Sequence, residues 1–278
     1  MKIQTETIPT WTDFMRLCAS DFTDVWHFRG ALDNWVLETA LERTARNWRI
    51  PLKEIPPIEQ ALLREFMRAY PPDASTPPPD NNDTLAWLSL MQHHGAPTRL
   101  LDWSYSPYVA AFFGLDALLR HGEENRKAAV WALSYKPLAA AQNLVPAHLG
   151  KAFQEYAMTR EGALFRTIFM DAEPPITFAP IVNPYRLHER LVLQQGVFLC
   201  QGNICLPFEE NLLALPGVME GGNIRKLMLP YSALSDAFRS LQSMNINRRT
   251  LFPGIDGFAR SLQHRVNFLR AAVQRGTY

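Results

Sequence analysis

One segment, residues 92–104 with the sequence QHHGAPTRLLDWS, constrains the fold more than any other part of the chain. Strongly apolar helical patterns flank it on both sides. Gly95 follows the first pattern, and Pro107 opens the second. A glycine just after a helix end is a typical stop signal, and a proline at the first helical position is a typical start signal. We therefore predict a helix that ends at Gly95, a short buried strand over 98–103, and a second helix that opens at Ser106-Pro107.

The rest of the chain alternates short strands with helices of unequal length. Neither of the two common glycine-rich phosphate-binding motifs, GxGxxG and GxxxxGK[ST], is present. The strands are too short and too irregularly spaced for a doubly wound parallel sheet. The sequence predicts an α+β fold, with small mixed or antiparallel sheets of short strands flanked by helices. Besides those above, we predict strands at 25–30, 128–134, 224–229 and after Gly196, and helices at 10–20, 34–48, 56–70, 85–94, 139–142, 148–158 and 232–244.

We expect a single domain over 1–278. A length of 278 residues and 47% hydrophobic content supply enough apolar material for one sizeable core. The proline-rich segment 71–83 is predicted to be a surface loop rather than a domain linker, because the segments on both sides of it are needed for one site. An amphipathic pattern predicts a C-terminal helix at about 253–274.

Charge and cysteine content exclude several classes of protein. A formal net charge of +1 does not require a nucleic acid or an anionic membrane as partner. The three cysteines have no CxxC spacing, which favours a reducing compartment, although Cys200 and Cys205 lie close enough in sequence to pair across a turn. No signal peptide and no membrane-spanning run is seen, so we expect a cytoplasmic protein.

Two arginines and a carboxylate are the first candidates for a binding site. The guanidinium groups of Arg29 and Arg99 have the forked donors that suit a diphosphate. Each also has a structural alternative, because Arg29 can be a solvent-exposed arginine of an edge strand. Arg99 can likewise form a buried ion pair with Asp102 that only holds the fold. The sequence leaves both alternatives open.

The neighbouring rings complete the candidate site. We expect one of His93 and His94 to face a pocket, with His93 preferred, where its imidazole can shuttle a proton near neutral pH. Trp103, Tyr105 and Tyr108 are candidates for stacking on an aromatic base. No metal site is expected, because adjacent histidines point apart on a helix, unlike ligands at i and i+4.

These residues belong to a series of motifs that resembles the FRG domain family, named for its N-terminal Phe-Arg-Gly. The resemblance covers the chain from about Trp26 to Leu262, with His94 at a position where the family often has an aromatic residue. The motifs in chain order are Phe28-Arg29-Gly30; the segment 92–104; Ser106-Pro107-x-x-Ala110-x-x-Phe113; Arg190-Leu191-x-x-Gln194-Gln195-Gly196-x-Phe198; and Leu251-Phe252-Pro253-x-x-Asp256-Gly257.

The order of these motifs is also similar to the layout of ADP-ribosyltransferases, which implies an ADP-ribosyltransferase-like fold and NAD as substrate. By that resemblance Arg29 binds the NAD phosphates or ribose, and Ser104 lines the nicotinamide pocket. Gln195 or Gln194 takes the position of a glutamate that orients the ribose or the acceptor, with Glu189 as an outside candidate. A glutamine is a departure, because a neutral amide can neither act as a base nor stabilise an oxocarbenium ion by charge.

Three functions follow from the two resemblances. The first is an enzyme that binds NAD and transfers or cleaves ADP-ribose, as a toxin or phage-defence effector, with Gln195 and His93 as catalytic residues and Arg29, Arg99, Ser104, Trp103 and Tyr108 binding the nucleotide. The second is a non-catalytic module that senses a nucleotide. The third is a structural or partner-binding domain. The expected partner is a small-molecule nucleotide, and no membrane is expected as a partner. The acceptor of the ADP-ribose, a nucleic acid or a protein, stays open.

Overall fold

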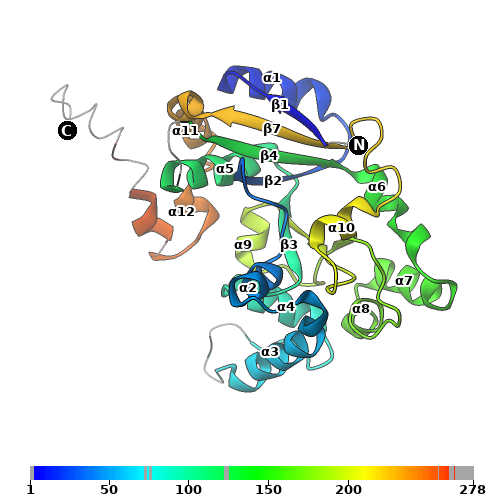
Figure 1. Cartoon of the computed structure of the whole chain (residues 1–278). Coiled ribbons are helices and arrows are strands. Elements are labelled where there is room, and N and C mark those ends of the chain that lie inside the picture. The colour runs from blue at the N-terminus through cyan, green and yellow to red at the C-terminus, as the bar shows by residue number, and fades with distance from the viewer. Residues whose placement is uncertain are drawn as a thin grey trace.

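The computed structural model describes residues 3–71, 74, 77–121, 125–255, 257–262 and 266. Its strands form one seven-stranded sheet in the order β1-β7-β4-β2-β3-β6-β5 (Figure 1). Neighbouring strands run antiparallel except β1 and β7, which are parallel. The strands are β1 (Gln4–Thr7), β2 (Trp26–Leu32), β3 (Leu100–Ser104), β4 (Lys127–Ser134), β5 (Ile181–Val182), β6 (Gly196–Cys200) and β7 (Ile224–Pro230).

Helices flank the sheet, and the predicted α+β class, with a mixed sheet of short strands, is confirmed. Three short 3-10 helices, η1 (Leu52–Glu54), η2 (Ala140–Leu144) and η3 (Tyr231–Ala233), join longer elements. The α-helices are α1 (Trp11–Asp21), α2 (Ala40–Trp48), α3 (Ile55–Ala69), α4 (Thr84–His93), α5 (Pro107–His121), α6 (Tyr135–Ala139), α7 (Ala147–Thr159), α8 (Gly162–Phe169), α9 (Glu189–Leu193), α10 (Phe208–Leu213), α11 (Leu234–Ser243) and α12 (Arg248–Leu251).

Local capping explains why the elements around the site begin and end where they do. The side chain of Asp83 accepts a hydrogen bond from the backbone N–H of Ala86 at 3.0 Å and caps α4. Gly95 follows α4 with φ of +84°, a conformation that glycine adopts without steric cost. The hydroxyl of Ser106 then accepts from the N–H of Val109 at 3.2 Å and caps α5. The predicted helix–strand–helix order over this region is therefore confirmed.

The sheet has a weak junction between β2 and β3. The two strands share a single registered pair, Phe28 with Ser104, whereas β2 pairs with β4 from Trp26 to Leu32 along its whole length. In Figure 1, β3 runs across the direction of β2, β4 and β7. The sheet therefore consists of two parts, β1-β7-β4-β2 and β3-β6-β5, that separate immediately beyond one residue pair.

Two large apolar cores hold these parts together. In the first, α1, α5 and α11 pack against β2, β4 and β7, and Phe14 and Phe112 are fully buried. In the second, α3, α4 and α8 pack around β3 and β6, with Leu88, Phe165 and Phe198 at its centre. The junction between β2 and β3 thus lies where the two cores meet.

Several predicted boundaries differ from the structure. The helix expected over 34–48 begins only at Ala40, because the Thr39 side chain caps it by accepting from the N–H of Glu42 at 3.1 Å. The strands β1 and β5 and the helices α6, α8, α10 and α12 were not expected. Most of the predicted C-terminal helix at about 253–274 lies outside the described residues, and so do four residues of the loop 71–83.

Candidate functional site

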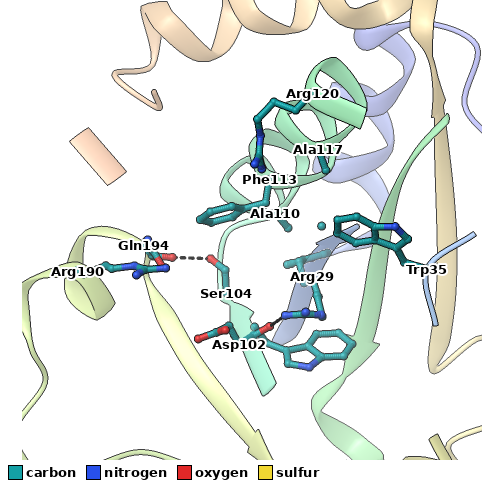
Figure 2. A pocket seen from close by; sticks show the side chains of 13 residues that line it. Arg29, Trp35, Asp102, Ser104, Ala110, Phe113, Ala117, Arg120, Arg190 and Gln194 are labelled. Carbon is teal, nitrogen blue, oxygen red and sulfur yellow. Dashed lines mark hydrogen bonds between the residues drawn. The ribbon is translucent and has the colours of Figure 1, made fainter. Parts of the chain in front are cut away.

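A cavity of about 230 Å³ opens at the junction where β2 and β3 separate (Figure 2). Residues of β2, β3, α5 and α9 form its wall, so elements from both parts of the sheet contribute. The lining residues are Phe28, Arg29, Gly30, Trp35, Asp102, Trp103, Ser104, Ala110, Phe113, Ala117, Arg120, Arg190 and Gln194. Of the predicted site residues, Arg29, Trp103 and Ser104 line this cavity.

Arg29 bridges the two strands where their backbone pairing stops. It follows Phe28, and its Nη1 donates a hydrogen bond to the backbone carbonyl of Asp102 at 2.5 Å. Burial lowers the pKa of Arg29, an effect that the Asp102 carboxylate opposes and Arg43 reinforces. A guanidinium remains charged in proteins despite such burial, so Arg29 places a fixed positive charge at the junction.

Two further guanidinium groups reach the same cavity. Arg120, on α5, forms an ion pair with Asp116 at 2.8 Å. Arg190, on α9, donates to the carbonyl of His93 at 3.5 Å, and burial lowers its pKa. Three arginines from three different elements therefore surround one cavity.

Asp102 is the one acidic residue among the described residues that line the cavity. Its side chain is exposed and accepts a hydrogen bond from Nε2 of Gln92 at 2.9 Å. In Figure 2 its carboxylate points to the same side as Arg190 and Gln194. The sequence analysis named Asp102 as a candidate but weighed it chiefly as a structural partner of Arg99, although one acidic residue in the mostly apolar strand LLDWS was a sequence signal for this site.

The alternative of an Arg99–Asp102 ion pair is wrong, because Arg99 pairs with Glu59 of α3 instead. Arg99 is only 2% exposed, and its Nε donates to Oε1 of Glu59 at 2.8 Å while Nη1 donates to the carbonyl of Phe169. The Arg99 side chain projects into the second core and does not line the cavity, so the residue expected to bind a diphosphate holds α3 against β3 in this structure.

Ser104 and the glutamine pair join the cavity wall to its surroundings. The Ser104 hydroxyl donates to the carbonyl of Gln194 at 2.8 Å and accepts from the N–H of Ser106 at 3.0 Å. Gln194 lines the cavity, whereas Gln195 is exposed, has φ of +46°, and is not a lining residue. Of the two amides considered for the third position, the structure brings Gln194 to Arg29 and Ser104.

His93 lies beside the cavity without lining it. Its ring is 4.5 Å from the ring of His188 and 4.9 Å from that of His94. Burial lowers the pKa of His93, and the nearby His94 and Arg190 act in the same direction. A histidine with a lowered pKa stays neutral at physiological pH, and Nδ1 of His93 has no hydrogen-bond partner among the described residues.

The aromatic candidates separate in the structure. Trp103 is buried in the cavity wall, and within the described part of the chain its indole N–H has no hydrogen-bond partner. The side chain of Tyr108 packs against the first core, where its ring lies 6.2 Å from that of Trp11. Burial raises the pKa of Tyr108. Trp35, which the sequence analysis did not single out, lines the cavity with 46% of its surface exposed.

Among the described residues, no group of three or more His, Cys, Asp or Glu is arranged to hold a metal ion. Nor does this part of the chain contain a helix long and apolar enough to span a membrane. Cys18, Cys200 and Cys205 are free, so the alternative pairing of Cys200 with Cys205 is not formed.

The comparisons with known proteins confirm the resemblance to the FRG domain family over residues 24–123, whereas the motifs at 190–198 and 251–257 lie outside the matched region. The family model of the FRG domain matches residues 24–123, which contain Arg29, Asp102, Ser104 and Arg120. Arg190 and Gln194 come from outside the matched region. Neither the search of curated proteins nor that of solved structures found a match. The chain therefore contains an FRG domain, and this domain supplies the β2, β3 and α5 sides of the cavity.

Proposed function

We propose that the cavity at the β2–β3 junction binds NAD or a related nucleotide, with the phosphates facing Arg29, Arg120 and Arg190. The observation that carries this proposal is the convergence of three guanidinium groups against one carboxylate, Asp102. Guanidinium forks match phosphate oxygens in geometry as well as in charge. An excess of fixed positive charge around one cavity favours an anionic ligand.

The walls of the cavity also suit a ligand with an aromatic base. Trp35 offers a half-exposed indole for stacking, and Phe113 lies on the opposite side of the cavity in Figure 2. Pockets for whole ligands usually exceed about 300 Å³, so this smaller cavity of about 230 Å³ encloses one end of a dinucleotide.

We further propose that the protein transfers or cleaves ADP-ribose in the cytoplasm, in the manner that the ADP-ribosyltransferase resemblance implies for a toxin or phage-defence effector. Cleavage breaks the bond between C1′ of the ribose and nicotinamide, which leaves with the electron pair of that bond. Asp102 then supplies the negative charge beside the developing oxocarbenium ion that a glutamine cannot. Water or another acceptor forms the new bond to C1′ and releases its proton to the solvent.

A non-catalytic nucleotide sensor is the second candidate. Two observations favour it: Gln195 is exposed, and His93 does not line the cavity. A sensor would bind the nucleotide and release no nicotinamide. A partner-binding domain, in contrast, would show no stabilisation by any nucleotide.

The first experiment measures thermal stability with NAD, ADP-ribose and nicotinamide. A ligand at a hundred times its dissociation constant adds about 2.7 kcal/mol to the native state, which raises the melting temperature measurably. We expect this increase in the wild type and a strong reduction in Arg120→Ala, which leaves Asp116 paired with Arg248. The matched control is Arg239→Ala, because Arg239 is exposed on α11 and its ion pair with Asp236 lies at the surface.

Nicotinamide release then separates the enzyme from the sensor. We expect Asp102→Asn to bind NAD but to lower the release rate about 100-fold or more, since one charged group in such a site is worth that much. An unchanged rate in Asp102→Asn would exclude the catalytic role of Asp102. If neither NAD nor ADP-ribose stabilises the wild type, the nucleotide-binding proposal fails.

A further inference from the structure

Helix α12 and the residue that follows it, Phe252, pack directly against the cavity wall, although they are far from the FRG-matched region in sequence. The ring of Phe252 lies 4.6 Å below the guanidinium of Arg190 and 5.0 Å from that of Arg248. The same ring meets that of Phe113 edge-on, with centroids 5.8 Å apart. One aromatic side chain therefore contacts two residues that line the cavity.

Hydrogen bonds and ion pairs extend this contact to the rest of the wall. Nε2 of Gln194 donates to the carbonyl of Leu251 at 3.0 Å. Arg248 forms a buried ion pair with Asp116 at 2.6 Å, and the same carboxylate pairs with Arg120. The segment around α12 thus touches Arg190 and Gln194 directly and reaches Arg120 through Asp116.

We infer that Phe252 is a positioning residue for Arg190. Its ring holds the Arg190 guanidinium toward the cavity and so sets the affinity of the site for phosphate. This inference rests on the proposed nucleotide-binding function. An arginine side chain loses much rotamer freedom when a ligand fixes it. A stacked ring imposes that order before the ligand arrives, and preorganisation of this kind improves affinity.

The surroundings of Arg190 show why the stacking matters. Burial lowers the pKa of Arg190 most, the negative charge of Asp102 raises it, and the positive charge of Arg248 lowers it further. Without the ring, repulsion from Arg248 and attraction to Asp102 would both act on a mobile side chain. The ring centroid of Phe252 lies within about 5 Å of both guanidinium groups, and the ring attracts both through its π electrons.

Phe252→Leu and Phe252→Tyr test the inference as a matched pair. Leucine keeps an apolar side chain but has no π face, whereas tyrosine keeps the face. The first readout is the rate at which an arginine-specific dicarbonyl reagent labels Arg190, quantified by mass spectrometry with exposed Arg239 as internal reference. The second is the dissociation constant for ADP-ribose and for inorganic pyrophosphate, by calorimetry.

We expect Phe252→Leu to label Arg190 about fivefold faster and to weaken ADP-ribose binding about fivefold, as the loss of one cation–π contact allows. Phe252→Tyr should stay near the wild type in both readouts. Equal labelling of the two variants overturns the positioning role, and so does faster labelling in Phe252→Leu with unchanged affinity. If the wild type binds neither probe, the nucleotide-binding proposal fails, while the labelling rates still decide whether Phe252 orders Arg190.

Discussion

Gly30, the glycine of the Phe-Arg-Gly motif, lies where α5 approaches β2 most closely. A Cβ atom at this position would lie 1.9 Å from the backbone carbonyl oxygen of Ala110. Gly114, one turn further along α5, is packed in a similar way, with the carbonyl of Ala129 at 3.0 Å from its would-be Cβ. The glycine is therefore required for the close packing that brings α5 to the cavity beside Arg29.

We predict that Gly30→Ala destabilises the protein by about 3 kcal/mol, because backbone atoms cannot move aside as a flexible side chain can. Urea denaturation followed by circular dichroism measures the change in the free energy of unfolding. Gly150→Ala, in α7, is the control: apart from its own helix turn, no atom of the described residues lies within 4 Å of its would-be Cβ, and alanine is the better helix former. Equal stability of Gly30→Ala and the wild type would contradict the packing argument.

At the scale of elements, the short helix α9 and its C-terminal cap residue deliver Arg190 and Gln194 to the cavity. Its start depends on His188, whose Nδ1 accepts a hydrogen bond from the N–H of Leu191 at 3.1 Å. Only a neutral imidazole can accept this bond. Burial, with His93 and Arg190 nearby, lowers the pKa of His188 from 6.5 to about 4.

This lowered pKa makes stability depend on pH. Because the unfolded chain takes up the proton near pH 6.5 and the folded one only near pH 4, stability is full above pH 6.5 and falls as the pH decreases to 4. We predict that His188→Asn, which keeps a good capping residue but does not titrate, reduces this loss. Urea denaturation between pH 4.5 and 7.5 measures this loss of stability in the variant and in the wild type.

Buried His27 provides the internal comparison for this experiment. Its pKa is also lowered to about 4, chiefly by burial, so a part of the pH dependence should remain in His188→Asn. A profile identical to that of the wild type would show that His188 does not contribute.

At the scale of the whole molecule, the cavity exists because the sheet separates into two parts at one residue pair. The FRG-matched region, 24–123, contains β2, β3 and α5. Their main pairing partners, β4 and β6, follow later in the chain, and so does Arg190. Both the sheet and the cavity therefore depend on segments beyond the matched region.

We predict that a fragment of residues 24–123 does not fold by itself. Without β4 and β6, β2 and β3 would retain only the pair Phe28–Ser104, and their apolar faces would be exposed to water. Proton–nitrogen NMR spectra should show the narrow dispersion of an unfolded chain, whereas the full chain gives a dispersed spectrum. A dispersed spectrum of the fragment would contradict this account.

The sequence by itself determined the elements whose signals are local. Capping side chains, glycine stops and apolar periodicity predicted α1, α4, α5, β4 and β7 closely, because these signals act within a few residues. The FRG motifs likewise identified the segment 92–104 and Arg29 as parts of one region. Polar β1 was not predicted, because its sequence has no apolar alternation and its pairing with β7 is long-range.

Only the tertiary structure decided which polar residues form the cavity. Arg99 and Asp102 are three residues apart, yet Arg99 pairs with Glu59 across 40 positions while Asp102 lines the cavity. Adjacent Gln194 and Gln195 separate likewise, because the positive φ of Gln195 turns the chain between them. Buried charges are stable only with partners, and those partners come from elements that are distant in sequence and meet only when both cores are packed.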